Sequence, residues 1–368
     1  MIYFDNAATS FPKPRCVIKE VNSCLKKYCG NAGRGSNSIS IRASEAIYSV
    51  REKVAELLGV DTPECIVFTY NATYALNFAI KSLIKENCHV LTSDYEHNSV
   101  IRPLEKLRNS IGISYSSFSS DGDIRASILK NITPHTAAIV CSLASNVTGQ
   151  TINLQILSDI AKEKGLILII DASQAAGHIQ IDLSKTPCDA LCAPGHKALF
   201  GIQGGGFVYF KDKKRKETLI EGGSGAQSVS PMMPMLLPEG YEAGTLSTPA
   251  IAALGSGIDY ISSVGIENIS KKLDKLTTLT CERLSKIKNV KIYGSGSGIV
   301  SFNMGDRSST YLASALDKAG ICSRAGLHCA PTIHRKLGTL NQGAVRVSFS
   351  YFNTERELDK LYHTLKNI

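Results

Sequence analysis

The chain has 368 residues, of which 43% are hydrophobic and 20% are charged, and its formal net charge is +9. This composition is typical of a globular protein, and the length exceeds the usual size of one hydrophobic core, so we expect two domains. The densest basic run, residues 211–216, lacks the interleaved aromatic residues of nucleic-acid binders. We therefore expect a solvated loop there and no nucleic-acid partner.

The eleven cysteines form no C-x-x-C pair and no cluster with the spacing of zinc ligands. This pattern argues against a disulfide framework and against a metal site. No apolar run approaches the roughly 20 residues that a membrane-spanning helix needs, and residues 1–5 lack the features of a signal peptide. The sequence therefore predicts a soluble cytoplasmic protein in a reducing compartment, with no membrane partner.

The first part of the chain is predicted to be mainly helical, over residues 15–58, with a break at the polar stretch 30–37. From residue 64 onward, short apolar runs alternate with helical patterns. The predicted strands are residues 65–69, 89–92, 137–141 and 166–170. Strands that are apolar on both faces and alternate with helices predict a mainly parallel sheet covered by helices.

The pattern changes after residue 240. The predicted elements are a helical stretch at 249–289, strands at 290–293 and 299–302, a helix near 309–319 and a strand at 344–349. Strands with few helices between them indicate a smaller α+β domain. We therefore predict an α/β large domain at residues 13–248, and a small domain made of residues 1–12 and 249–368.

Asp171 and Lys197 each end an apolar, strand-like run, and Lys197 precedes a glycine-rich turn. Ligands of open α/β sheets bind outside the carboxyl ends of strands, where both residues fall. An amine and a carboxylate suit pyridoxal 5'-phosphate (PLP): the lysine forms a Schiff base, and the carboxylate keeps the ring nitrogen protonated. Burial in a cleft would lower the lysine pKa, as a Schiff base requires. The pair predicts a PLP enzyme.

Two further motifs follow predicted strands. Thr73 lies where a strand gives way to a helix, so helix N–H groups and its hydroxyl would hold a phosphate. The alternative, that Thr73 only caps the helix, is compatible with phosphate binding. His97 follows the next strand and would stack on the cofactor ring and pass protons; a purely structural histidine is the alternative.

Arg346 lies inside the apolar strand 344–349, where a guanidinium group needs a carboxylate partner. A substrate α-carboxylate would be gripped by two hydrogen bonds, whereas the alternative is an exposed arginine on the outer face. Cys329 lies in a polar loop, directly after His328 and near Arg324. Positive neighbours lower the pKa of a thiol, so Cys329 is a candidate nucleophile; the alternative is one more buried cysteine.

In this order, these motifs resemble the class V aminotransferase-like PLP enzymes of fold type I, and specifically the cysteine desulfurase and selenocysteine lyase group. The matching segments are 3–8, 31, 34–35, 96–98, 145–149, 171–177, 195–197, 242–245, 324–330, 346 and 353–355. The short segment 324–329 resembles the second desulfurase group, whose cysteine sits on a compact loop.

The resemblance implies a role for each position. For the cofactor, it assigns the aldehyde to Lys197, the ring nitrogen to Asp171, the ring hydroxyl to Gln174, ring stacking to His97, and the phosphate to Thr73, the N–H of Ala72, His196 and, from the other subunit of a homodimer, Thr245. For the substrate, it assigns the carboxylate to Asn146 and Arg346, with Arg324 beside them, and the sulfur to Cys329.

The activity implied is conversion of L-cysteine to L-alanine, with the sulfur held as a persulfide on Cys329 and passed to an acceptor protein. The chain departs from the usual pattern at Pro194 and Ala72, where hydroxyl residues are common, and at Leu327, Gly33 and Asn37, where histidines are common. These departures indicate an atypical branch. The alternatives are a selenocysteine lyase acting on L-selenocysteine, another class V enzyme (C–S lyase, epimerase or aminotransferase), and a sulfur-delivery protein without its cofactor.

Overall fold

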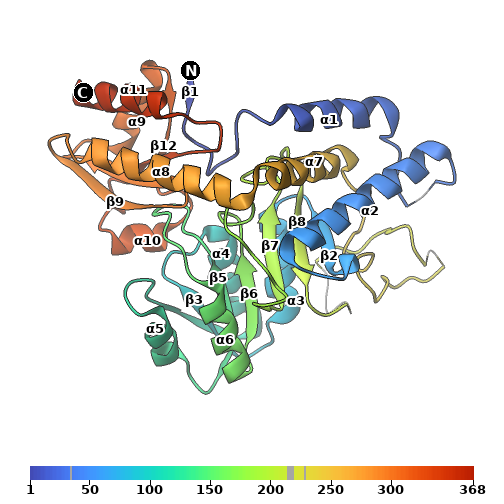
Figure 1. Ribbon diagram of the computed structural model, residues 1–368. Coiled ribbons are helices and arrows are strands. Elements are labelled where there is room, and N and C mark those ends of the chain that lie inside the picture. Colours follow the sequence, from blue (N-terminus) through green and yellow to red (C-terminus); the bar gives the residue numbers. More distant parts are fainter. Residues whose placement is uncertain (34, 214–218, 228) are drawn as a thin grey trace.

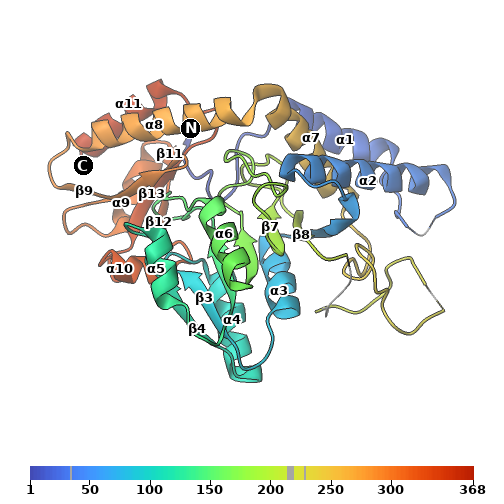
Figure 2. The same ribbon diagram turned by 60° about the horizontal axis from the view of Figure 1, so that its bottom comes forward.

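The computed structural model describes residues 1–33, 35–213, 219–227 and 229–368 (Figures 1 and 2). Within this part of the chain, seven strands form the large sheet, in the order β2-β8-β7-β6-β5-β3-β4. Their bounds are β2 (Ile66–Thr69), β3 (His89–Ser93), β4 (Ser114–Phe118), β5 (Thr136–Ser142), β6 (Ile167–Asp171), β7 (Ala190–Pro194) and β8 (Gly206–Phe210). Only β8 runs against its neighbours. The predicted α/β class with a mainly parallel sheet is confirmed.

Helices cover both faces of the large sheet. Their bounds are α2 (Ser38–Leu58), α3 (Ala72–Leu83), α4 (Asn98–Ile111), α5 (Ile124–Asn131), α6 (Leu154–Lys164) and α7 (Thr248–Val264). Successive strand residues point to opposite faces, and the core divides accordingly. Val140 and Ile169 pack in one cluster with α3 and α4, whereas Ile139 and Ile170 pack in the other with α2, α6 and α7.

The small sheet is antiparallel, in the order β12-β13-β10-β9, within the described ranges. Its strands are β9 (Val290–Gly296), β10 (Ile299–Met304), β12 (Arg324–Gly326) and β13 (Ala344–Ser348), and the helices of this region are α8 (Ile266–Leu284), α9 (Ser309–Lys318), α10 (Pro331–Lys336) and α11 (Glu355–Lys366). At the start of the chain, β1 (Ile2–Tyr3) pairs with β11 (Ile321–Cys322), and α1 (Arg15–Lys27) packs against α7. Figure 1 shows both termini on the side of the molecule that carries α9 and α11.

Several elements differ from the sequence expectations. The helical stretch 249–289 is divided at Gly265, because its φ of +87° is incompatible with a continuous right-handed α-helix. The segment 324–326 is a strand rather than a loop, and β4 is a strand of mostly polar residues at the sheet edge. Residues 211–213 are exposed, whereas 214–216 and Arg34 lie outside the described residues. The division of the chain at residue 248 stays a prediction.

The loop after β5 brings the two sheets together. Gly149, with φ +69°, lies so close to β9 that an added Cβ would stand 2.0 Å from the carbonyl oxygen of Gly296. On β9, a Cβ at Gly294 would stand 2.5 Å from the Cβ of Thr148. Glycine on both sides therefore allows this loop to pack directly against the small sheet.

We predict that Gly149→Ala lowers thermal stability far more than Gly122→Ala. Both glycines have φ near +70°, but an added Cβ at Gly122 meets no atom within 4 Å. The left-handed backbone penalises both variants alike, and overpacking adds roughly 1–3 kcal/mol at Gly149 alone. Thermal unfolding of the two variants measures the difference, and equal shifts would contradict the contact between the sheets.

Candidate active site

A cavity of about 300 Å³ opens at the carboxyl edge of the large sheet. Its walls come from the segments that follow β2, β3, β5, β6 and β7, because parallel strands end at one edge. The lining residues are Asn71, Ala72, Thr73, Leu76, His97, Ser99, Ser142, Ala144, Asn146, Asp171, Ser173, Gln174, Pro194, His196 and Lys197. Most of the predicted site residues therefore meet in one place.

Lys197 follows β7 and lines the cavity. The preceding carbonyl, of His196, accepts hydrogen bonds from the Ser10 N–H, the Thr9 hydroxyl and Lys13 Nζ, at 2.9–3.1 Å. These bonds fix the backbone beside Lys197. Burial lowers the pKa of Lys197 to about 8, although the nearby Asp171 carboxylate opposes the shift. Near neutral pH, a useful fraction of this amine is thus uncharged and able to act as a nucleophile or base.

Asp171 ends β6 and faces the same cavity with only 5% of its surface exposed. One carboxylate oxygen accepts the Ser173 N–H at 2.8 Å. Gln174, one turn later, donates its side-chain N–H to the Ala7 carbonyl at 2.9 Å. The first residues of the chain thus contribute to the cavity wall by orienting Gln174.

His97 stands in the cavity as a neutral imidazole. Its Nδ1 accepts the Ser99 N–H at 3.1 Å, so the proton of the neutral ring is on Nε2. Burial lowers the pKa of His97, the Asp171 charge opposes this shift, and the charge of Lys197 adds to it. A neutral, planar ring is suited to lie against a flat aromatic ligand.

The N-terminus of α3 forms an anion-binding corner of the cavity. Asn71 caps this helix by accepting the Tyr74 N–H, and the free N–H groups of the first turn attract anions. The Thr73 hydroxyl lies 2.8 Å from the Ser99 hydroxyl. His196 Nδ1, on the other wall, is buried with no hydrogen-bond partner in the described structure.

Ser99 is a cavity residue that the sequence reasoning missed. It lies in the first turn of α4, directly after a strand and a short loop, which is the same signal that identified Thr73. Its hydroxyl also lies 3.0 Å from His97 Nδ1. Because Pro194 and Ala72 line the cavity without hydroxyls, Ser99 restores one hydroxyl to this corner.

Cys329 is exposed, and its backbone is fastened to the rim of the cavity. Its carbonyl accepts the Asn98 N–H at 2.8 Å, and the preceding carbonyl, of His328, accepts Asn146 Nδ2 at 2.7 Å. Both His328 and Cys329 have a left-handed backbone, with φ of +50° and +57°. Such conformations persist where the surroundings hold them. The backbone of Cys329 therefore lies next to Asn98 on a compact, anchored loop, and the alternative of a buried cysteine is excluded.

His328 supplies no positive charge to Cys329, so the sequence expectation is wrong for this neighbour. Its Nε2 lies 3.1 Å from the Ala344 carbonyl oxygen, on the inner side of the loop. Burial, reinforced by the charge of Arg346, lowers the pKa of His328 to about 2. The other cation expected from the sequence, Arg324, has a side chain that is 44% exposed and lies 3.9 Å from Asp5.

Arg346 lies on β13 and is only 2% exposed, which excludes the alternative of an outward-facing arginine. It donates from Nη1 to the Asn146 carbonyl and from Nη2 to Asp5 Oδ1, both at 2.8 Å. Arg324 lies opposite on β12, with Nη1 3.9 Å from Asp5 Oδ2. Sequence reasoning missed Asp5, whose signal was its place in the matching segment 3–8.

Four of the predicted site residues do not line the cavity: Arg324, Cys329, Arg346 and Thr245. Thr245 is exposed. In the described residues, no group of three or more His, Cys, Asp and Glu side chains could hold a metal ion. No helix of the described chain is long and apolar enough to cross a membrane.

Comparison with known proteins identifies the family. The aminotransferase class-V family model matches residues 2–361. The chain belongs to this family. A probable cysteine desulfurase of Methanothermobacter thermautotrophicus is 32% identical over all of this chain and 94% of its own length. A probable cysteine desulfurase of Pyrococcus abyssi is 30% identical over the same shares. The family predicted from the sequence is confirmed.

Solved structures agree with this assignment. The apo structure of a cysteine desulfurase from Thermococcus onnurineus NA1 superposes with a TM-score of 0.91 and 29% identity, covering all of this chain and 94% of that one. A complex of the cystine C–S lyase C-DES with cysteine persulfide gives a TM-score of 0.83 at 20% identity, covering all of this chain and 97% of that one. This second likeness concerns the fold alone.

A buried carboxyl group below the cavity makes the fold sensitive to pH. Glu96 is fully buried and accepts hydrogen bonds from the Ser93 hydroxyl and from the N–H and hydroxyl of Ser142. Burial raises its pKa from 4.5 to about 7, although these bonds oppose the shift. The fold thus favours the protonated form, and the stability that this form contributes is lost as the pH rises from about 4.5 through about 7.

We predict that Glu96→Gln, which removes the charge and keeps the shape, becomes more stable relative to the wild type as the pH rises. The advantage should grow by about 2 kcal/mol between pH 5 and pH 8. Thermal unfolding at both pH values measures it, with the exposed Glu86→Gln as the control. A difference that does not change with pH would contradict the raised pKa.

Proposed function

We propose that this chain is a PLP-dependent cysteine desulfurase, which converts L-cysteine to L-alanine and takes the sulfur onto Cys329 as a persulfide. The observation that carries the proposal is the placement of an exposed, anchored cysteine at the rim of a cavity that holds Lys197 and Asp171. The activity in the names of the relatives supports the same reaction.

The residues of the cavity fit PLP. Lys197 would hold the aldehyde, Asp171 the ring nitrogen, Gln174 the ring hydroxyl, and His97 would lie on the ring. The phosphate would be held by the first turn of α3, the Thr73 and Ser99 hydroxyls and His196. An anion is expected there because His196 Nδ1 has no hydrogen-bond partner in the described structure and the first N–H groups of α3 are available as donors. When bound, PLP supplies an electron sink for the bonds at the substrate α-carbon.

The protein's own residues then move protons and sulfur. Lys197, with a pKa lowered to about 8 by burial, takes the proton from the substrate α-carbon and returns it. Asp171 keeps a proton on the ring nitrogen. The Cys329 thiolate attacks the substrate sulfur, forming an S–S bond. The bond between this sulfur and Cβ breaks, its electron pair stays with Cβ, and Cβ takes a proton. Alanine and a Cys329 persulfide result.

Sulfur leaves the enzyme from an exposed position. Cys329 lies on the surface, so a persulfide there is accessible to a thiol of a sulfur-acceptor protein. The compact loop gives the sulfur a short reach, because both flanking carbonyls are held by Asn146 and Asn98. An acceptor must therefore approach the rim itself. A cytoplasmic setting, which keeps such thiols reduced, is part of the proposal.

A homodimer would complete the site. Large apolar side chains are exposed on the segment after β2 and on the segment before residue 240; the most exposed are Tyr70, Tyr74, Val229, Met232, Met235 and Leu236. Exposed apolar surface of this extent marks interaction sites. Thr245, which is exposed and outside the cavity wall, would reach the phosphate of the partner's cofactor.

The proposal predicts distinct losses for two variants. Lys197→Ala should reduce alanine formation from L-cysteine by at least about a thousandfold. Cys329→Ser should abolish sulfide release in the presence of a reductant. Alanine and sulfide are measured with purified holoenzyme, and Cys29→Ser, at another exposed cysteine, is the control. Sulfide release that survives in Cys329→Ser would refute the persulfide role.

A further inference from the structure

We propose that Asp5 is an internal carboxylate that occupies Arg346 until the substrate α-carboxylate takes its place. Asp5 is thus a positioning residue that acts through Arg346 and sets the affinity for carboxylate-bearing substrates. The inference rests on the proposed function, because it assumes that an amino acid binds in the cavity beside Asn146. Beyond that function, it assigns Asp5 a part in discriminating between ligands with and without a carboxylate.

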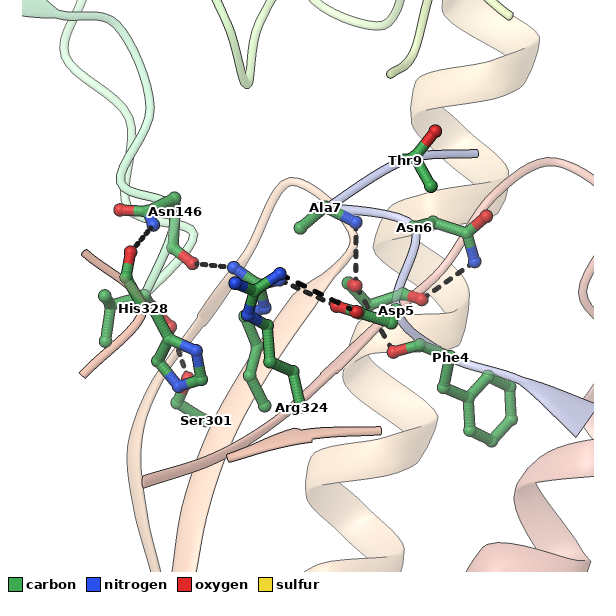
Figure 3. Close-up of polar contacts among 12 residues, drawn as sticks. Phe4, Asp5, Asn6, Ala7, Thr9, Asn146, Ser301, Arg324 and His328 are labelled. Carbon is green, nitrogen blue, oxygen red and sulfur yellow. Dashed lines mark hydrogen bonds and ion pairs between the residues drawn. The ribbon is translucent and has the colours of Figure 1, made fainter. Parts of the chain in front are cut away.

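The two arginines need an anion between them. Arg324 and Arg346 are directly opposite each other on β12 and β13, so their side chains share one face. Like charges in such a pair repel. Asp5 relieves the repulsion with Oδ1 2.8 Å from Arg346 and Oδ2 3.9 Å from Arg324. Figure 3 shows Arg324 directed toward Asp5. One carboxylate serves two guanidinium groups, which leaves one positive charge unmatched.

The chain on both sides of Asp5 is fixed by hydrogen bonds to β13, whereas its carboxylate contacts the two arginines. The Phe4 carbonyl accepts the Ser348 N–H at 2.7 Å, and the Ala7 N–H donates to the Ser348 hydroxyl at 2.9 Å (Figure 3). Asn6 Nδ2 donates to the Ser348 carbonyl at 3.0 Å. These bonds fasten the turn to β13 two residues beyond Arg346. The carboxylate is therefore preorganised beside the guanidinium group.

In this arrangement both terminal nitrogens of Arg346 already make a hydrogen bond. Nη1 is bonded to the Asn146 carbonyl, Nη2 to Asp5, and Nε is buried without a partner in the described structure. Asn146 itself lines the cavity. A substrate carboxylate that arrives beside Asn146 therefore competes with Asp5 for Nη2 of Arg346.

Arg324 makes the exchange possible. Removing one partner from a buried ion pair is costly when the other is left unpaired. Asp5 is already 3.9 Å from Arg324, whose exposed side chain can close this gap. The final state has two carboxylates on two guanidinium groups, so no charge is left alone. Breaking the Asp5–Arg346 bond subtracts from the binding free energy of the carboxylate, whereas ligands that lack a carboxylate leave the pair intact.

The test compares two matched amines on the holoenzyme. L-alanine and ethylamine differ by the carboxylate, and the visible absorbance of the cofactor reports the binding of both. We expect Asp5→Asn to increase the affinity for L-alanine by about tenfold and to leave the affinity for ethylamine unchanged. For Asp5→Glu, we expect both affinities to stay near those of the wild type. Asp359→Asn, which breaks the exposed ion pair with Arg283, is the control. Weaker or unchanged L-alanine binding in Asp5→Asn would overturn the proposal.

A second measurement does not depend on the folding of the variant. In a crystal structure of the wild-type holoenzyme with L-alanine, the ligand carboxylate should lie on Arg346, with Asp5 moved onto Arg324. An Asp5–Arg346 distance that remains at 2.8 Å with the ligand bound would overturn the exchange.

Turnover of L-cysteine by the same preparations separates the two proposals. A wild type that forms no alanine, together with tighter L-alanine binding in Asp5→Asn, would refute the desulfurase function and support the role of Asp5. An active wild type whose affinity for L-alanine does not respond to Asp5→Asn would refute the role of Asp5 alone.

Discussion

The hydrogen bonds of Asn146 join the two sheets where the chemistry needs both. Its carbonyl accepts Arg346 Nη1 from β13, and its side chain donates to the His328 carbonyl, next to Cys329. The large sheet supplies the cavity with Lys197, and the small-sheet region supplies the guanidinium groups and the thiol. The close packing of Gly149 on β9 lets the Asn146 loop reach that far. Cofactor chemistry and sulfur transfer can therefore occur side by side.

Burial sets the charge states of the site. It lowers the pKa of Lys197 to about 8, lowers that of His97, and raises that of Glu96 to about 7. The same effect keeps His328, the residue before Cys329, neutral. Asp5 places a carboxylate between the two arginines, with Oδ1 2.8 Å from Arg346 and Oδ2 3.9 Å from Arg324. The cavity thus combines a weakly basic amine and a neutral imidazole, and the two arginines lie beyond its wall at Asn146.

The sequence predicted those features that depend on local patterns. Apolar strands followed by polar residues placed Asp171, Lys197, His97 and Thr73 at one edge, because parallel strands share their carboxyl ends. Features that depend on distant contacts escaped prediction. The pairing of Asp5 with Arg346 joins residues 341 positions apart. Strand β4 carries no apolar run because it lies at the sheet edge. The burial of His328, which keeps its ring neutral, depends on distant residues and cannot be recognised from the sequence around it.

In the proposed reaction, substrate sulfur is transferred to Cys329 itself. The most direct test mixes the holoenzyme with one equivalent of L-cysteine without reductant, quenches in acid, and determines peptide masses. We expect one added sulfur atom on the peptide that contains Cys329, in equal amount to the alanine formed. Alanine formation with an unmodified Cys329 peptide, or with the added sulfur on another cysteine, would contradict it.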